Sequence, residues 1–433
     1  MKRYYLFIFA ALCALVLGCS SGSEPEEGGG NGPDIDVSDK PQVGKTLPDW
    51  SEGYLDIHAI NTGRGECTLL ILPDGTTMLI DAGDVGNGWG TSGGPVFPND
   101  SKTPGEWIVA YIDHFTQKLP ATSTLDYLWL THFHGDHMGT GAASSGTSVA
   151  GYRLSGVTTV GEHVAIHKIV DRAYPSYDIP SQKAVMENAN GDFMNDYLAF
   201  VDDQTGRKGA VAERFEVGSN TQFSLTHDAA AYPTFTVRNL CANGEVWTGS
   251  GTASEKSYTD LSKFDENALS GAIKMSYGPF SYYAGGDLGG GTDYTQYPSS
   301  ERDLETPVSK VCGKITVLKA NHHGCGDTTN PVFLRNLHPD AIVILASHVL
   351  HPYGSTMARM LDPLAWSADA DLYITSDLCR QKLGSQFNRF KPYGHVVVRV
   401  YEGGTKYRIF VLDPLAGDYP IKYASDEMNV QTN

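Results

Sequence analysis

Four side chains of the types that bind metal ions stand within six consecutive positions of the chain. His132, His134, Asp136 and His137 lie in the run His-Phe-His-Gly-Asp-His, directly after an apolar segment that ends at Thr131. Alternate residues of an extended segment point to the same side, so the first two imidazoles can face one point. The glycine between them and the last two residues lets the chain turn toward a second point close by. This spacing predicts the metal site of a hydrolase.

The residue types also limit the choice of metal. Imidazole and carboxylate ligands suit zinc, and manganese or iron is the alternative. A site that mixes these ligands usually keeps one coordination position for water. The competing interpretation is a solvated polar loop, which the sequence disfavours because four candidate ligands share a single turn.

Short strands are expected to position this cluster. Residues 54–60, 68–72 and 77–80 are apolar runs separated by turn residues, which predicts three strands. Residues 106–115 have the apolar spacing of a helix, and 125–131 is again strand-like.

The rest of the chain alternates between apolar runs and looser segments. Residues 175–262 contain much Gly, Asn, Asp and Ser with weak periodicity and are predicted to form long loops, although 235–240 is strand-like. Helices are expected at 331–337 and 356–364. Further strands are predicted at 164–170, 268–277, 280–284, 315–320, 341–346, 396–400 and 407–412.

Polar side chains follow several of these predicted strands directly. Asp81 comes after 77–80, Asp287 after 280–284, and His322 and His323 after 315–320. Strand ends that converge are a common way to assemble a catalytic site.

These segments resemble the motifs of the metallo-β-lactamase superfamily. Asp81 in Leu-Ile-Asp-Ala-Gly is similar to the first motif, and the cluster that begins at His132 is similar to the second. Asp287 in Ala-Gly-Gly-Asp-Leu resembles the metal-bridging aspartate, and His322 and His323 in His-His-Gly resemble the final motif. The resemblance implies an α+β fold, a four-layer αββα sandwich that holds one or two metal ions between its sheets.

A closer resemblance is to the extracytoplasmic hydrolase domain of DNA-uptake competence proteins. Asn-Thr-Gly-Arg-Gly-Glu-Cys at 61–67 is similar to its opening turn, and Glu266-Asn267 to its Glu-Asn pair. The run from Leu318 to Cys325 resembles its Lys-x-x-His-His-Gly-Ser, and His351-Pro352 its later His-Pro. The resemblance covers most of residues 54–365, but not the membrane-spanning parts of those proteins, so DNA transport is not inferred.

The resemblance also implies roles for the metal-binding residues. One metal ion is expected to be held by Asp136, His137, Asp287 and one of His322 or His323. His132 and His134 would face a second metal ion, with the same aspartate as a bridge and a hydroxide shared between the two.

The third motif of the superfamily usually supplies another histidine to the metal ion near His132, and no residue between His137 and Asp287 matches it cleanly. His163, His167 and His227 lie in this interval, but a lone histidine is more often a packed residue than a ligand. The first metal position is therefore expected to be weak or empty.

Other candidate residues surround the ligands. Asp81 is expected to orient a ligating imidazole, and His351 to protonate a leaving group or to bind a phosphate oxygen. Arg172 could contact phosphate or form a structural ion pair, with the second at least as favoured. Cys325 is expected to be a packing residue.

The N-terminal region has the pattern of an export signal. Residues 1–19 combine a basic start, an apolar stretch too short to span a membrane, and a run, Val-Leu-Gly-Cys, that resembles the lipobox of bacterial lipoproteins. Cys19 would then carry a lipid anchor, in an outer membrane facing the periplasm or the cell surface. Residues 20–49 are predicted to be a flexible acidic tether, 50–415 the hydrolase domain, and 416–433 a C-terminal tail.

Composition excludes some classes of partner. The chain of 433 residues has 50 Asp and Glu against 32 Lys and Arg, a net charge of −18, and no dense basic run. This argues against a broad nucleic-acid surface, which depends on many cationic contacts to phosphates.

Three functions follow from these features. The first is hydrolysis of a phosphodiester, or another small phosphate ester, by a metal-bound hydroxide in an exported lipoprotein, which His351-Pro352 and the competence-protein resemblance favour. The second is attack on a carbonyl, as in a lactone, a thioester or a β-lactam, since the same site can polarise either group. The third is a surface binding lipoprotein with a degenerate metal site. The sequence leaves the substrate, the metal and the oligomeric state open.

Overall fold

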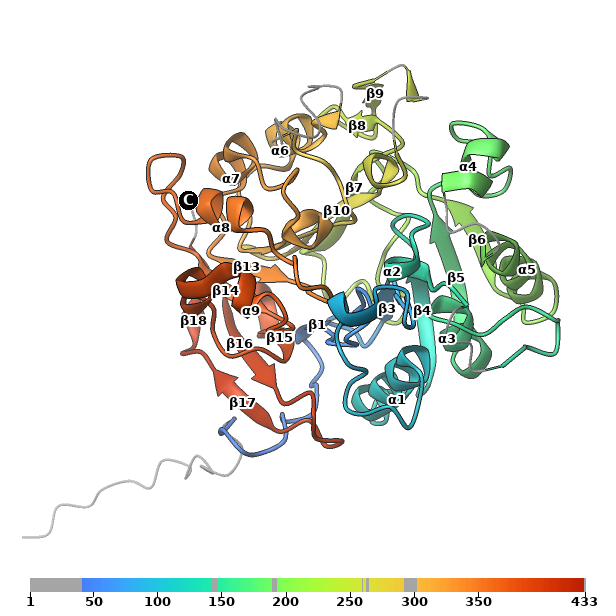
Figure 1. Ribbon diagram of the computed structural model, residues 1–433, viewed down its shortest axis with the longest axis horizontal. Helices are drawn as coiled ribbons and strands as arrows, with labels where there is room; N and C mark the ends of the chain where they lie inside the picture. The colour runs from blue at the N-terminus through green and yellow to red at the C-terminus, as the bar shows by residue number, and fades with distance from the viewer. Residues whose placement is uncertain are drawn as a thin grey trace, which may run out of the picture. The chain divides into compact units, whose positions relative to one another are not determined.

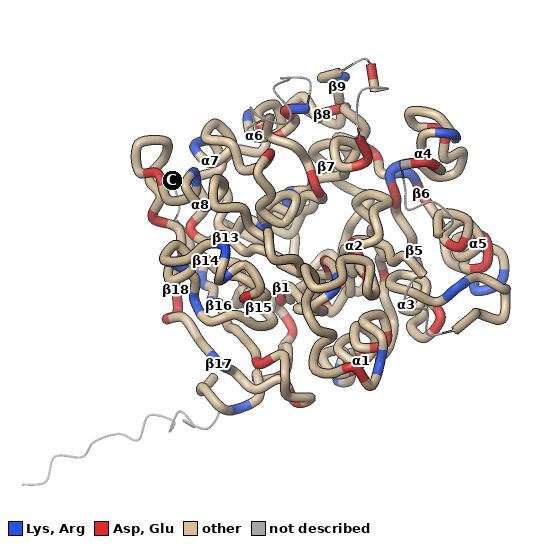
Figure 2. Tube along the Cα trace, in the orientation of Figure 1, with Lys and Arg blue, Asp and Glu red and all other residues tan. Residues whose placement is uncertain are grey.

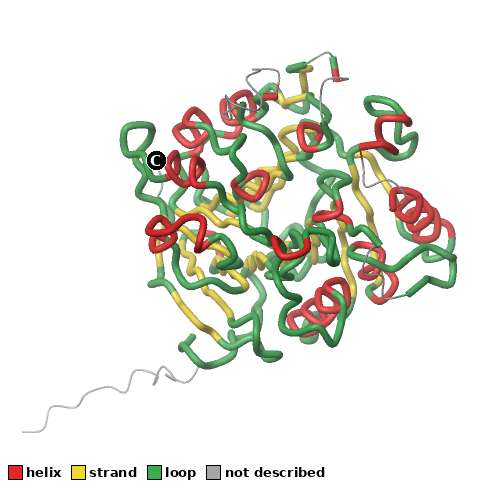
Figure 3. The backbone as a smooth tube through the Cα atoms, in the orientation of Figure 1, coloured by secondary structure: helices red, strands yellow, loops and turns green. Residues whose placement is uncertain are grey.

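The computed structural model describes residues 41–141, 146–188, 193–258, 260–261, 265–291 and 302–431. These residues form a mixed α/β structure with two multi-stranded sheets, and helices lie along both (Figures 1 and 3). The predicted signal segment 1–19, including Cys19, and the tether up to residue 40 lie outside the described residues. In the part of the chain that is described, no helix is long and apolar enough to cross a membrane.

The first sheet combines antiparallel and parallel pairing. β1 to β3 form an antiparallel meander, and β4, β5 and β6 extend it in parallel from β3. In spatial order its strands are β17 (Ile421–Ala424), β16 (Lys406–Leu412), β15 (His395–Val400), β1 (Leu55–Ala59), β2 (Thr68–Ile71), β3 (Thr77–Ile80), β4 (Thr124–Trp129), β5 (Ala165–Asp171) and β6 (Val211–Arg214), with β18 (Met428–Asn429) paired to β16.

The second sheet has a similar division. Its antiparallel hairpin β10–β11 continues into β12, β13 and β14, which run parallel to β11. In spatial order its strands are β14 (Asp371–Ile374), β13 (Ala341–Ile344), β12 (Val317–Lys319), β11 (Phe280–Gly285), β10 (Ala272–Tyr277), β7 (Phe235–Ala242), β8 (Glu245–Trp247) and β9 (Ser254–Lys256).

Three apolar layers hold these elements together. One layer lies between the two sheets, where Leu55, Ile57 and Trp129 of the first sheet meet Ile273 and Tyr282 of the second. A second layer packs the other face of the first sheet against α1 (Pro104–Thr116), α3 (Val157–His163) and α5 (Phe193–Gly206). A third packs the second sheet against α6 (Glu305–Cys312), α7 (Pro331–Leu337) and α8 (Gly354–Met360).

The prediction of long loops over residues 175–262 is wrong. Residues 175–262 contain α4 (Gln182–Asn188), α5 and the strands β6 to β9 as well as loops. The apolar face of α5 is sparse, but Phe193, Tyr197 and Phe200 are fully buried against the first sheet, and this packing outweighs a weak local pattern.

The domain also extends beyond both of its predicted ends, residues 50 and 415. The segment predicted as a C-terminal tail contributes β17 and β18, and Ile421 is buried. Thr46 pairs with Pro420, and Leu47 joins the core, so the end of the predicted tether is part of the domain. Cross-strand pairing with distant residues, which a local pattern does not reveal, orders both segments.

An ion pair between β1 and β15 predicts how stability responds to acid. Asp56 and Arg399 face each other in the strand register and are almost fully buried, with two nitrogen–oxygen distances of 2.9 and 2.6 Å. Burial alone would raise the pKa of Asp56, but the guanidinium outweighs it and lowers the pKa to about 2. A lowered carboxyl pKa stabilises the fold above the unfolded value near 3.8, and this contribution is lost as the pH falls toward 2.

The Asp56 carboxylate is therefore expected to contribute about 2 kcal/mol to the free energy of unfolding at pH 4, and this contribution should be lost by pH 2. Urea unfolding at several pH values, compared between wild type and Asp56→Asn, measures the difference. An identical pH dependence in the two proteins would contradict the prediction.

Lys and Arg are spread along the described elements and interspersed with Asp and Glu (Figure 2).

Candidate metal centre

The polar residues that follow four strands, two in each sheet, come together at the carboxyl ends of those strands. Asp81 follows β3, and the cluster around α2 (Gly135–Met138) follows β4. Asp287 follows β11, and His323 follows β12. Because β3 is parallel to β4, and β11 to β12, the carboxyl ends of each pair lie at the same edge of their sheet.

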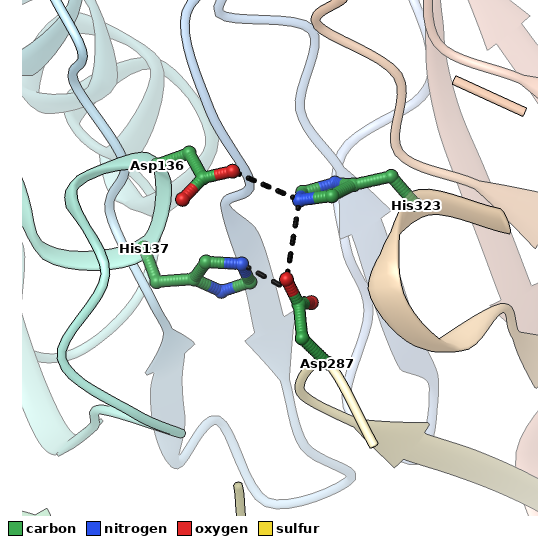
Figure 4. A group of neighbouring side chains, drawn as sticks. All are labelled: Asp136, His137, Asp287 and His323. Carbon is green, nitrogen blue, oxygen red and sulfur yellow. Dashed lines mark hydrogen bonds and ion pairs between the residues drawn. The ribbon is translucent and has the colours of Figure 1, made fainter. Parts of the chain in front are cut away.

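Four of these side chains point toward one another (Figure 4). His137 Nε2 lies 3.2 Å from Asp287 Oδ1, and His323 Nε2 lies 3.0 Å from Asp136 Oδ2 and 3.5 Å from Asp287 Oδ2. One donor atom from each residue can be chosen so that all four lie within 4.8 Å of one another. The sequence allows either His322 or His323 at this position, and the structure brings His323 into the group.

The donor set fits a divalent cation. Two imidazole nitrogens and two carboxylates are ligands that zinc accepts. His137 Nε2 and Asp287 Oδ1 are both shielded from solvent, and apart from their mutual ion-pair contact neither has a hydrogen-bond partner among the residues that the structure describes. Buried polar atoms without hydrogen-bond partners are rare. Two such atoms lie next to each other where the four side chains meet, and a bound metal ion would satisfy both.

A second group of contacts fixes the His137 ring. Asp81 Oδ2 lies 2.7 Å from His137 Nδ1, and Asp81 also accepts hydrogen bonds from the backbone N–H and the hydroxyl of Thr131, both at 2.8 Å. In the neutral ring that a metal ion requires, an Nδ1–H that donates to this carboxylate leaves the lone pair on Nε2, which faces Asp287. Asp81 therefore lies where it can orient the ligand, as the sequence analysis expects.

Glu66 and Lys319 support His323 from the opposite side. Glu66 Oε1 lies 2.9 Å from His323 Nδ1, and Glu66 Oε2 lies 2.6 Å from Lys319 Nζ. Lys319 also donates to the carbonyl of Gly285 at 2.7 Å. Both residues lie within sequence motifs, but local patterns predict no role for them, because their contact joins segments about 250 positions apart.

The carboxylates create a field that favours cations. Burial lowers the pKa of a histidine, but the charges of Asp287 and Glu66 outweigh it and raise the pKa of His323 to about 10. Burial also opposes protonation of His137, yet Asp287 and Asp81 hold its pKa well above the ordinary value. Metal binding needs neutral imidazoles, so it is expected to release protons.

The remaining three predicted ligands lie beside this group of four, and the His132 ring is 4.1 Å from that of His137 between centroids. His132 Nε2 is 3.9 Å and His322 Nε2 is 3.8 Å from Asp287 Oδ2. His134 Nδ1 is 3.2 Å from His132 Nε2.

Arg172 and Glu266 position the segment between His132 and His134. Glu266 Oε1 accepts a hydrogen bond from the backbone N–H of Phe133 at 2.9 Å. Arg172 pairs with both carboxylate oxygens of Glu266 at 2.7 and 2.5 Å and lies over the Phe133 ring, 4.6 Å from its centroid. The sequence allows two roles for Arg172, contact with phosphate or a structural ion pair. The structure shows the ion pair.

His351 lies against the cluster. Its ring stacks on His323 with centroids 4.2 Å apart and an angle of 3°. Burial and the neighbouring His323 hold the pKa of His351 well below the ordinary value. A neutral imidazole is suited to hydrogen bonding with a substrate oxygen more than to giving up a proton.

The candidate third-motif histidines are not at this centre. His167 and His227 lie 3.3 and 3.6 Å from Asp126, near the start of β4, whereas the metal cluster follows the end of that strand. His163 ends α3. Cys325 is a free, partly exposed thiol.

Comparison with known proteins gives no assignment, because no family model and no curated protein matches the chain.

Proposed function

We propose that this protein is a metal-dependent hydrolase with the metallo-β-lactamase fold. The observation that carries the proposal is the convergence of Asp136, His137, Asp287 and His323, which come from three segments of the chain. The αββα order of the layers and the position of the cluster at the carboxyl ends of strands from both sheets support the same assignment.

Each residue of the cluster has a distinct task. Asp136, His137, Asp287 and His323 would hold a divalent ion, zinc or manganese, which supplies a Lewis acid and lowers the pKa of water when bound. Asp81 holds the His137 ring through the contact at Nδ1. The Nδ1 atom of His323 lies 3.0 Å from the carbonyl oxygen of Leu345, to which an Nδ1–H donates, and Glu66 lies beside it as an ion-pair partner at 2.9 Å.

The proposed substrate class is a phosphodiester. The neutral His351 ring, stacked on His323, can donate a hydrogen bond to a phosphate oxygen held beside the metal position.

Hydrolysis of bis-p-nitrophenyl phosphate, measured with added zinc or manganese, tests this function. We expect turnover that requires the metal and falls by about 100-fold or more in His137→Ala, because a direct ligand should matter at least as much as its supporting residues. His167→Ala, which removes an exposed histidine outside the cluster, should leave turnover unchanged. Metal binding without phosphodiester turnover, together with hydrolysis of a lactone, thioester or β-lactam, would contradict the substrate assignment.

A further inference from the structure

We propose that Trp89, with His348 beside it, forms a subsite next to the metal cluster for a flat aromatic ring on the substrate, an aryl group or a nucleobase. The subsite would bind the substituent of the phosphate ester, while the phosphate itself lies at the metal position. This inference rests on the proposed function, because it assumes that His351 contacts a phosphate oxygen there.

A row of aromatic rings leads from a proposed metal ligand to the partly exposed Trp89. The buried His351 ring stacks on His323, with centroids 4.2 Å apart. Trp89 and His348 both lie against His351, with centroid distances of 5.7 and 5.3 Å, and 5.3 Å from each other. Only the His351 ring therefore separates Trp89 from the ligand His323, and a phosphate bound beside His351 would place its ester substituent near the indole.

Backbone contacts between two loops hold this arrangement. Trp89 directly precedes the short helix η2 (Gly90–Ser92), in the segment between β3 and α1. Gly93 pairs with His348 in an antiparallel bridge, and the N–H of Val349 donates to the carbonyl of Ser92 at 2.9 Å. The loop that carries Trp89 is thus fixed to the loop that carries the two histidines.

Trp89 keeps the surface that ring binding needs. Its side chain is partly exposed, and its contacts with His348 and His351 are edge-to-face, with interplanar angles of 72° and 85°. Among the described residues, no ring stacks parallel to the indole and none accepts a hydrogen bond from its Nε1. A Cβ added to the adjacent Gly90 would meet no atom within 4 Å, so the turn beside the indole is open. An exposed indole combines a flat apolar face with a polar N–H, and such rings stack on other aromatic groups.

His348 adds a hydrogen-bond donor beside the indole. The backbone N–H of Leu350 lies 3.2 Å from His348 Nδ1, so Nδ1 carries a lone pair. Burial lowers the pKa of His348, which favours the neutral ring, and the proton of that ring is then on Nε2. No described residue bonds to this Nε2, so it is available to an acceptor on the ring or the sugar of a ligand.

The charge of the chain favours a small ester over a polymer as the ligand. The net charge is −18, and the described Lys and Arg are interspersed with Asp and Glu (Figure 2). Binding of a nucleic-acid strand depends on many cationic contacts to phosphates, whereas stacking on one aromatic side chain needs none. The subsite therefore suits a single ring on a small phosphate ester.

Isothermal titration of the zinc-loaded protein with phenyl phosphate and with methyl phosphate tests the inference, because the two ligands share the phosphate and differ in the ring. We expect wild type to bind phenyl phosphate about 10-fold more tightly than methyl phosphate, and Trp89→Ala to lose most of this preference, since stacking of one ring on an aromatic side chain is worth about that much. Trp89→Phe keeps a flat ring and should retain most of the preference.

Trp107→Ala is the matched control. Trp107 is also partly exposed, but it lies on α1 and its Nε1 donates to the carbonyl of Asn99 at 2.9 Å. Its substitution should leave the affinities for both phosphates at the wild-type values.

Titration with adenosine monophosphate and with ribose phosphate distinguishes the two kinds of ring. A loss in Trp89→Ala that is larger for adenosine monophosphate than for phenyl phosphate assigns the subsite to a nucleobase, and the reverse assigns it to an aryl group. No preference of wild type for either ring-bearing phosphate, or an unchanged preference in Trp89→Ala, would overturn the inference and leave the proposed function intact. Absence of phosphodiester turnover in wild type would instead contradict the proposed function, and the titrations do not depend on turnover.

Discussion

Asp287→Asn is expected to lower zinc affinity by about 100-fold or more. Loss of a residue that merely supports a ligand typically costs 10- to 100-fold, and Asp287 lies within 4 Å of a nitrogen of His132, His137, His322 and His323. Asparagine keeps the size of the side chain but removes its charge. Competition titration with a zinc chelator measures the change.

Asp126→Asn is the control for this experiment. Asp126 also faces two histidines, His167 and His227, but these are partly exposed and lie away from the metal cluster. Zinc affinity should remain that of wild type. Equal losses in the two variants, or no loss in Asp287→Asn, would contradict the assignment of the ligands.

Arg172→Met is expected to destabilise the fold by about 3–5 kcal/mol, because it leaves the Glu266 carboxylate buried without its charged partner. Arg172 and Glu266 are each 1% exposed, and Arg172 also donates to the carbonyl of Ile179 at 2.8 Å. Since Glu266 holds the backbone N–H of Phe133, the same variant should weaken zinc binding by His132 and His134. Urea unfolding measures the stability change.

Arg380→Met is a suitable comparison for that variant. Arg380 also pairs with a carboxylate, Asp377 at 3.2 Å, and covers a phenylalanine ring, but its side chain is 55% exposed. Its substitution should cost less than about 1 kcal/mol. The double variant Arg172→Met with Glu266→Gln should recover part of the lost stability, because the unpaired charge is removed. A cost for Arg172→Met no larger than that for Arg380→Met would contradict the argument.

Local patterns predict much of the framework that carries the site. The helix expected at 106–115 is α1. It begins at Pro104, and a capping box between Thr103 and Glu106 stabilises its first turn. The strand expected at 125–131 is β4, and the ligand cluster follows it as the sequence indicates. These elements were predictable because their burial pattern, caps and turns all lie within a few adjacent residues.

Other features depend on contacts between distant segments. The pairing of Arg172 with Glu266 spans 94 positions, and that of Glu66 with Lys319 spans about 250. Sequence spacing alone also does not separate His322 from His323, because their left-handed backbone sets the direction of each ring. Long-range packing likewise orders α5, whose residues look loop-like in isolation.

Anomalous diffraction at the zinc absorption edge, from crystals of the zinc-loaded protein, tests the central claim most directly. We expect a strong peak at bonding distance, about 2 Å, from donor atoms of Asp136, His137, Asp287 and His323. The assignment of these four ligands would be contradicted by zinc-loaded crystals with no peak at this cluster. A zinc peak beside Asp126, His167 and His227 instead would contradict it equally.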